Sequence, residues 1–173
     1  FQAGDFKQSP KPSITVHSTE IELGIENFML SLGTMLGVID SDPKFSLMPP
    51  FVRYLSEVAF IQIGDASITG IPGELYPEIA VGGIENPIGA DYVIAPQEVP
   101  HLRSQFSDKL NLMVNLANDS IGYIIPKSEW DEDAPWIYGE KEETYGEVVS
   151  LGPNTAPVIH ENLLELIKES KNK

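Results

Sequence analysis

The 173-residue sequence contains no cysteine, and this absence excludes disulfide bonds, thiolate nucleophiles and thiolate metal ligands. Basic residues are also scarce, with 11 Lys and Arg against 26 Asp and Glu and a formal net charge of −15. A surface of this sign repels phosphate groups. We therefore expect that the protein has no nucleic-acid partner.

Histidine motifs and long hydrophobic runs are missing too. The three histidines, His17, His101 and His160, form no HxH or HxxxH pair, which excludes a self-contained histidine metal motif. Each is predicted to be a surface or hydrogen-bonded polar residue. The longest apolar stretches, such as residues 58–61, are far too short to cross a bilayer. The sequence also has no GxSxG nucleophile elbow and no Walker loop.

Apolar patterns indicate strands in the first half of the chain. Residues 1–12 contain two prolines and little periodicity, and they are predicted to form a loose tail. Apolar residues alternate over residues 13–25, and residues 57–63 and 66–71 are also typical of strands. The Gly-Asp dipeptide between the last two segments is a turn signal, so these segments are predicted to form a hairpin.

The second half of the chain mixes helix and strand signals. The hairpin ends at Pro-Gly-Glu, residues 72–74, and residues 75–81 favour a short helix. Residues 82–108 have no clear period, so they form either a functional excursion or a misassigned region. Residues 110–116 are predicted to be a buried strand, and residues 123–125 a short extended segment.

The C-terminal segment is predicted to be an amphipathic helix. Asn154 or Thr155 can cap it, Pro157 suits its first turn, and the apolar residues 159, 163, 166 and 167 fall on one face. Together these patterns predict an α/β (mixed α+β) fold for a single domain over residues 13–173. Its parts are a mixed sheet, a hairpin that leads to Pro-Gly-Glu and the C-terminal amphipathic helix.

Aromatic and acidic residues are dense in residues 116–157, which is more typical of a site than of a structural loop. Tyr123 follows the polar turn after the strand 110–116, and a tyrosine there either packs, binds a metal or donates a proton to an oxyanion. Tyr145 lies beside a glycine that allows close backbone approach. The acidic run 131–133 lacks the spacing of a calcium loop and is predicted to be solvated.

Glu74 is a further candidate. It directly follows a strand and a Pro-Gly turn, near the expected start of a helix, where the helix dipole stabilises a carboxylate. It is either an ordinary residue of a helix N-terminus or a metal ligand at the end of a sheet, where sites collect.

Three ordered segments of the chain resemble the neutral/alkaline (non-lysosomal) ceramidase family. They are IQIGDASITGIPGE at residues 61–74, NLANDSIGY at residues 115–123 and TYGEVVSLGPNTA at residues 144–156. The resemblance extends over residues 56–170, whereas the first 55 residues match only loosely. It implies a zinc amidase that cleaves the N-acyl bond of sphingolipids, with this chain as the C-terminal part of the catalytic domain of a bacterial-type relative.

The resemblance also implies the roles of three residues. Glu74 and Tyr123 would be zinc ligands, together with two histidines from the N-terminal half of the catalytic domain, and Tyr145 would stabilise the oxyanion as a catalytic residue. The family's histidine motifs and its Gly-Asp-Val-Ser segment have no counterpart in this sequence. We therefore expect a zinc cofactor in the parent hydrolase, weak zinc binding by this chain alone and no activity of the isolated chain.

Partners and location follow from the same resemblance. The implied substrate is lipid-like or another N-acyl small molecule, and the implied macromolecular partner is the missing N-terminal half of the catalytic domain. The Gly- and Pro-rich stretch at residues 79–100, between Glu74 and Leu110, replaces a helix of the family, so it bears on substrate choice. The implied location is secreted, periplasmic or membrane-associated.

Residues 28–39, FMLSLGTMLGVI, are apolar with two glycines and suit an irregular buried helix or a pair of strands. If the domain is incomplete, they are also the candidate for an exposed apolar surface, and we then expect a homo-oligomer that buries it. The competing interpretation of the whole chain belongs to a different class: a non-catalytic binding or interaction domain that keeps the fold without the upstream zinc histidines.

The site hypothesis makes a geometric prediction. Glu74 and Tyr123 should lie at the same end of one sheet, with their side-chain oxygens converging to roughly 3–5 Å, as two ligands of one zinc do. Tyr145 should approach the same place from the loop before the final helix.

Overall fold

The structure, a computed structural model, describes Lys11 and residues 13–39, 42–107, 110–142 and 144–171. The loose tail expected for residues 1–12 therefore lies almost entirely outside the described residues. Among the described helices, none is long and apolar enough to span a membrane.

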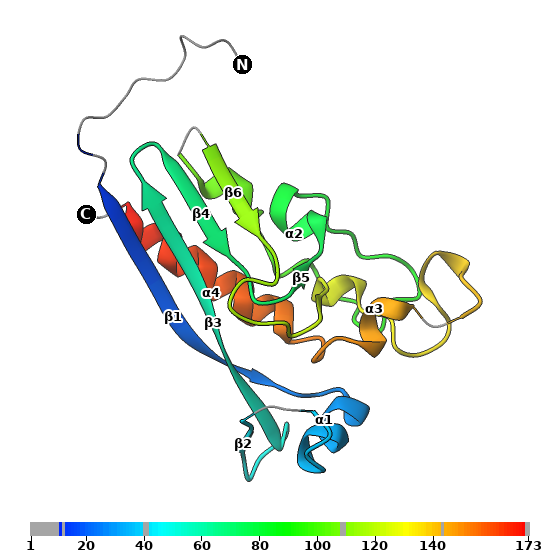
Figure 1. Cartoon of the computed structure of the whole chain (residues 1–173). Helices are drawn as coiled ribbons and strands as arrows, with labels where there is room; N and C mark the ends of the chain where they lie inside the picture. Colours follow the sequence, from blue (N-terminus) through cyan, green and yellow to red (C-terminus); the bar gives the residue numbers. More distant parts are fainter. Residues whose placement is uncertain (1–10, 12, 40–41, 108–109, 143, 172–173) are drawn as a thin grey trace.

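A five-stranded mixed sheet forms the centre of the molecule (Figure 1). Its strands are β1 (Ile14–Gly24), β2 (Lys44–Phe45), β3 (Val52–Ile63), β4 (Ala66–Gly70) and β6 (Leu110–Val114). The order across the sheet is β1-β3-β4-β6, and β2 pairs with the start of β3. The strand predicted for residues 13–25 is confirmed, and the strand predicted for residues 57–63 is the second half of the longer β3.

The pairing directions follow from the length of each connection. β3 and β4 form the predicted hairpin, with Ile63 opposite Ala66 across a turn in which Gly64 has a φ of 58°. β4 and β6 are parallel, with Ala66 opposite Leu110, because residues 71–109 are long enough to return the chain to the same end of the sheet. The mixed sheet expected from the sequence is confirmed.

Helix α4 (Thr155–Ser170) covers one face of the sheet, behind β1 and β3 (Figure 1). Asn154 occupies the N-cap position and Pro157 lies in the first turn, as predicted. The apolar face of α4 is buried against β1 and β3, and its main members are Ile159, Leu163, Leu166 and Ile167. Each of these side chains contributes about 1.5–3 kcal/mol by burial, so this layer is the main source of stability.

The remaining elements are short. They are α1 (Phe28–Met35), β5 (Glu74–Leu75), α2 (Pro77–Val81), η1 (Leu102–Gln105), β7 (Tyr123–Ile124), η2 (Lys127–Glu129), η3 (Ile137–Gly139) and α3 (Tyr145–Val148). The stretch 82–108 is irregular apart from η1, in line with its lack of a sequence period.

Three local predictions were wrong about burial. Residues 28–39 begin with the helix α1, which is not buried, since Phe28 is 73% exposed and Leu36 is 69% exposed; the exposed apolar surface expected of the same segment is thereby confirmed. The strand β6 is not buried on both faces, because it lies at the sheet edge and α4 covers one face only, which leaves Leu112 50% exposed. Within the acidic run 131–133, Asp131 is fully buried, and its carboxylate accepts a hydrogen bond from the Ile137 backbone N–H at 3.0 Å.

Candidate functional site

The candidate site lies where the parallel strands β4 and β6 end. The chain leaves β4 and passes directly into β5, while the chain leaving β6 reaches β7 after one loop. β5 and β7 form a two-stranded parallel sheet of their own, in which Glu74 pairs with Tyr123 and Leu75 with Ile124. Two residues almost 50 positions apart in the sequence are thus direct neighbours.

Two glycines make this close pairing possible. A Cβ atom on Gly73 would collide with the carbonyl oxygen of Gly122, and a Cβ atom on Gly122 would collide with the carbonyl oxygen of Val149. Gly122 also has a φ of 87°, a conformation that side chains rarely adopt. The Gly122 carbonyl accepts a hydrogen bond from the Glu74 backbone N–H at 2.9 Å. The segments that carry Glu74 and Tyr123 are therefore held at backbone contact.

The side chains of Glu74 and Tyr123 interact directly. A hydrogen bond to the Glu74 carboxylate, followed by the negative charge of that carboxylate, raises the pKa of the Tyr123 phenol. The phenol is therefore protonated at neutral pH and donates to Glu74. Glu74 and Tyr123 are thus neighbours, although they lie in the separate two-stranded sheet of β5 and β7 and not at the end of the main sheet.

Tyr145 lies beside this pair, as expected. It is the first residue of α3, and its ring meets the Tyr123 ring edge-on at a centroid distance of 6.0 Å. Tyr145 is 71% exposed, so its hydroxyl remains accessible to a ligand in front of the pair. The structure thus brings Glu74, Tyr123 and Tyr145 together.

Sequence reasoning missed Tyr76. Its ring also meets the Tyr123 ring edge-on, at a centroid distance of 6.1 Å. The Tyr76 hydroxyl lies against Gly146 of α3, where an added Cβ atom would lie 2.5 Å from the hydroxyl oxygen. Burial and, next, the negative charge of Glu147 raise the pKa of Tyr76 to about 12. Tyr76 follows Glu74 by two positions. In an extended segment residues two apart lie on the same face, and this period of two is the signal that could have identified Tyr76.

Glu147 is the second residue that sequence reasoning missed. Its side chain is buried, and its carboxylate accepts a hydrogen bond from the Thr144 hydroxyl. Burial raises the pKa of Glu147 and outweighs the opposite effect of the Thr144 hydrogen bond. The negative charge of this carboxylate also raises the pKa of the neighbouring Tyr76 phenol, because a phenolate beside it would be repelled.

No histidine joins the site among the described residues. The imidazole of His160 lies 3.0 Å from the Pro100 carbonyl oxygen, that of His101 lies 3.3 Å from the Ala80 carbonyl oxygen, and His17 lies 3.9 Å from the Glu169 carboxylate. Within the described part of the chain, no group of three or more His, Cys, Asp or Glu side chains could hold a metal ion. Glu74 and Tyr123 are thus a pair of oxygen donors without a nitrogen ligand beside them.

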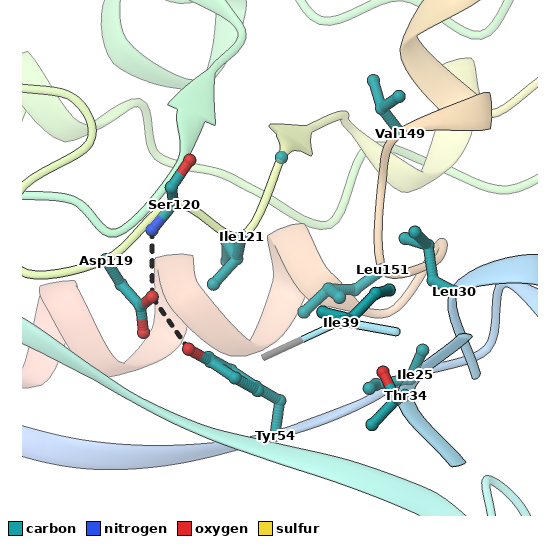
Figure 2. Close-up of a pocket in the computed structure, with 11 residues that line it drawn as sticks. Ile25, Leu30, Thr34, Ile39, Tyr54, Asp119, Ser120, Ile121, Val149 and Leu151 are labelled. Atoms are coloured by element: carbon teal, nitrogen blue, oxygen red, sulfur yellow. Dashed lines mark hydrogen bonds between the residues drawn. The ribbon is translucent and has the colours of Figure 1, made fainter. Parts of the chain in front are cut away.

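An apolar cavity of about 450 Å³ lies next to the loop that leads into Tyr123, and Figure 2 shows its lining residues. Its walls come from β1, β3, α1 and the loops around residues 119–122 and 149–151, and they include Ile25, Leu30, Ile39, Tyr54, Ile121 and Leu151. Gly122 and Val149 also line it, so the cavity and the candidate site share the loops that carry Tyr123 and Tyr145. A ligand at the site could extend an apolar group into this cavity.

Asp119, in the polar turn singled out in the sequence, is the main polar group of the cavity wall. Its carboxylate accepts hydrogen bonds from the Tyr54 hydroxyl at 2.9 Å and the Ser120 backbone N–H at 3.0 Å (Figure 2). It also accepts one from the Ser56 hydroxyl at 3.0 Å. These bonds attach the loop that precedes Tyr123 to the strand β3. Asp119 therefore positions this loop.

Comparison of the chain with protein-family models, with curated proteins and with solved structures finds no match.

Proposed function

We propose that this chain forms one wall of the active site of a zinc-dependent amide hydrolase that acts on lipid-like N-acyl substrates. Glu74 and Tyr123 are the zinc ligands of this wall, and Tyr145 is the hydrogen-bond donor to the oxyanion. The observation that supports the proposal is the direct pairing of Glu74 with Tyr123, with Tyr145 at the edge of the same ring. The resemblance of the three ordered segments to the ceramidase family assigns the same three residues.

The donor set fits zinc in part. A carboxylate oxygen and a phenol oxygen that share a proton are converging donors, and a divalent cation can take the place of that proton. A catalytic zinc site usually has about three protein ligands, and this wall supplies two. When bound, zinc supplies a Lewis acid that polarises the amide carbonyl and lowers the pKa of a bound water to about 7.

The residues of the wall have separate tasks. Glu74 accepts the proton of Tyr123 in a hydrogen bond and so orients the phenol before a metal arrives. Tyr145 is exposed and donates its hydroxyl to charge that develops on the substrate oxygen. Tyr76, with its pKa raised to about 12, remains protonated and supports the ring of Tyr123 from the other side. The apolar cavity behind the site takes the hydrocarbon part of the substrate.

The remaining ligands come, in this proposal, from a polypeptide that covers the outer face of the sheet, the face opposite α4. This face carries exposed apolar side chains, which are Ile14, Val16, Ile63, Leu110, Leu112 and Val114. Parallel strands such as β4 and β6 are normally covered on both faces. The N-terminal half of a ceramidase-like catalytic domain, with its two histidines, is the partner that fits. A secreted, periplasmic or membrane-associated location follows from the same family resemblance.

Zinc titration tests the ligand assignment. We expect weak binding that produces the near-ultraviolet absorbance of a tyrosinate, because zinc displaces the proton of Tyr123. Tyr123→Phe should remove this absorbance and Glu74→Gln should weaken the binding, whereas the exposed control Glu132→Gln should change neither. An absorbance change that persists in Tyr123→Phe would show that the assignment is wrong.

A non-catalytic binding domain is the second candidate, and the exposed apolar face of the sheet is the observation that favours it. The parent reading frame distinguishes the two. Two histidine motifs encoded upstream of residue 1 support the hydrolase. A coding sequence without them supports the binding domain.

A further inference from the structure

A second exposed apolar surface lies on α1 and on the hairpin formed by β2 and the start of β3 (Figure 1). We call it the apolar platform. Its exposed large side chains are Phe28, Met29, Leu32, Met35, Leu36, Val38, Ile39, Phe45, Leu47, Met48 and Phe51. Its members do not include the apolar residues of the outer sheet face, whereas Ile39 also lines the cavity behind the candidate site.

The two parts of the platform form one surface. A groove of about 380 Å³ runs between them and is lined by Phe28 and Ser31 of α1 and by residues 49–51 of the hairpin. The helix is firmly attached, because the Asn27 side chain caps it by accepting from the Leu30 N–H at 3.1 Å and donates to the Val148 carbonyl at 3.1 Å. The apolar side chains are thus presented from ordered secondary structure.

The area of the platform is that of a protein interface. Its side chains are between 37% and 100% exposed, with Leu47 at the upper limit. At roughly 150 Å² or more for each large side chain, the exposed apolar area is on the order of 1,000 Å². The largest apolar patch of a typical monomer is roughly 300–600 Å², whereas a stable interface buries about 800 Å² on each partner. The platform is therefore large enough for a stable dimer.

The charge distribution favours a second copy of the chain. Two chains of net charge −15 repel each other, so a self-interface must exclude their carboxylates. Residues 28–39 contain no charged residue. In an isologous contact this uncharged segment faces its own copy, which keeps the like charges of the two chains away from the α1 part of the contact.

A lipid surface suits the platform less well. Segments that lie in a membrane interface combine apolar residues with Trp and with Lys or Arg for the lipid head groups. Residues 28–51 contain no Trp or Tyr and have one basic residue, Lys44. The neighbouring Arg53 is bonded to Glu22 at 2.9 Å.

We propose that the apolar platform is the interface of a homodimer, in which α1 and the β2–β3 hairpin of one protomer pack on the same elements of its partner. This inference does not depend on the proposed function. Because the interface is apolar and the chains repel each other, dimerisation should strengthen with added salt, which screens the repulsion.

Sedimentation equilibrium of the whole chain tests the proposal. The variant Met29→Glu places a carboxylate in the first turn of α1, where it favours the helix, and Leu47→Glu changes a fully exposed side chain, so both variants should fold. We expect the wild type to be a dimer. In the double variant, which carries both substitutions, the dissociation constant of the dimer should be higher by on the order of 100-fold, because a dimer of the variant buries unpaired carboxylates. Ile88→Glu is the matched control, since Ile88 is 97% exposed outside the platform, and it should remain dimeric.

Three outcomes would overturn the proposal. The first is a wild type that is monomeric at the concentrations used in hydrodynamic measurements. The second is a double variant that dimerises as well as the wild type. The third is a monomer that floats with phosphatidylcholine vesicles and binds them through the platform residues. A circular dichroism spectrum shared by the wild type and all the variants establishes that the variants fold.

Discussion

Replacement of Gly122 by alanine tests whether the candidate site depends on backbone contact between β5 and β7. Gly122 has a φ of 87°, and for an alanine this conformation costs roughly 1–2 kcal/mol. The new Cβ atom would also overlap the Val149 carbonyl oxygen, and overpacking of this kind costs roughly 1–3 kcal/mol more. The free energy of unfolding should therefore fall by about 3 kcal/mol.

Gly64→Ala is the matched control. Gly64 has a φ of 58°, but no atom lies within 4 Å of a Cβ placed there, so the substitution costs only the conformational part, about 1 kcal/mol. Urea unfolding measures both changes, provided that the dependence on urea concentration is the same in both variants. Equal losses for Gly122→Ala and Gly64→Ala would refute the close contact of β7 with the segment after α3.

The same substitution should disturb the candidate site. The Gly122 carbonyl holds the Glu74 backbone N–H at 2.9 Å, so a shift of this loop moves Tyr123 away from the Glu74 carboxylate. The pKa of Tyr123 should then fall toward its ordinary value. Spectrophotometric titration at alkaline pH measures it, and an unchanged Tyr123 titration in a destabilised Gly122→Ala protein would contradict the coupling.

Three further predictions concern the site and the core. Glu74→Gln should lower the pKa of Tyr123, because the substitution removes the negative charge that raises it; an unchanged alkaline titration would exclude the contact. The pKa of Tyr76 is about 12 in the folded protein against an ordinary 10.0, so the unfolded chain loses this proton first, and the stability of the wild type falls as pH rises from 10 to 12. Tyr76→Phe should reduce this loss of stability. A fall of the same size in the variant would assign it to other groups. Leu163→Ala should cost about 3 kcal/mol in thermal or urea unfolding, because Leu163 is fully buried, whereas Leu47→Ala should change stability by less than about 0.5 kcal/mol unless the platform is covered.

Local patterns were sufficient for the elements that are defined by their own neighbours. The hairpin of β3 and β4 follows from strand residues on both sides of a Gly-Asp turn, and α4 follows from its capping residues and its apolar face. The neighbourhood of Glu74 and Tyr123 was predicted from their positions after the strands 66–71 and 110–116, because neighbouring parallel strands end at the same edge of a sheet. Their direct pairing in a second small sheet, β5 with β7, was not predicted.

Other features were not predictable, because they depend on what lies opposite a residue in space. Asp131 lies in an acidic run that has every local mark of a solvated loop, yet it is buried and bonded to the Ile137 N–H. Tyr76 joins the site only because α3, about 70 positions later in the sequence, places Gly146 against its hydroxyl.

By itself, the sequence determined where strands and the long helix form, which residues alternate or share a face, and which chemical groups are unavailable. Only the tertiary structure decided which apolar faces are covered. Leu163 and Leu112 both belong to apolar faces of regular elements, but α4 packs on one side of the sheet alone, so the first is buried and the second is half exposed. Periodicity identifies the apolar face of an element, whereas burial requires a second element opposite that face, and residues distant in the sequence determine whether one is there.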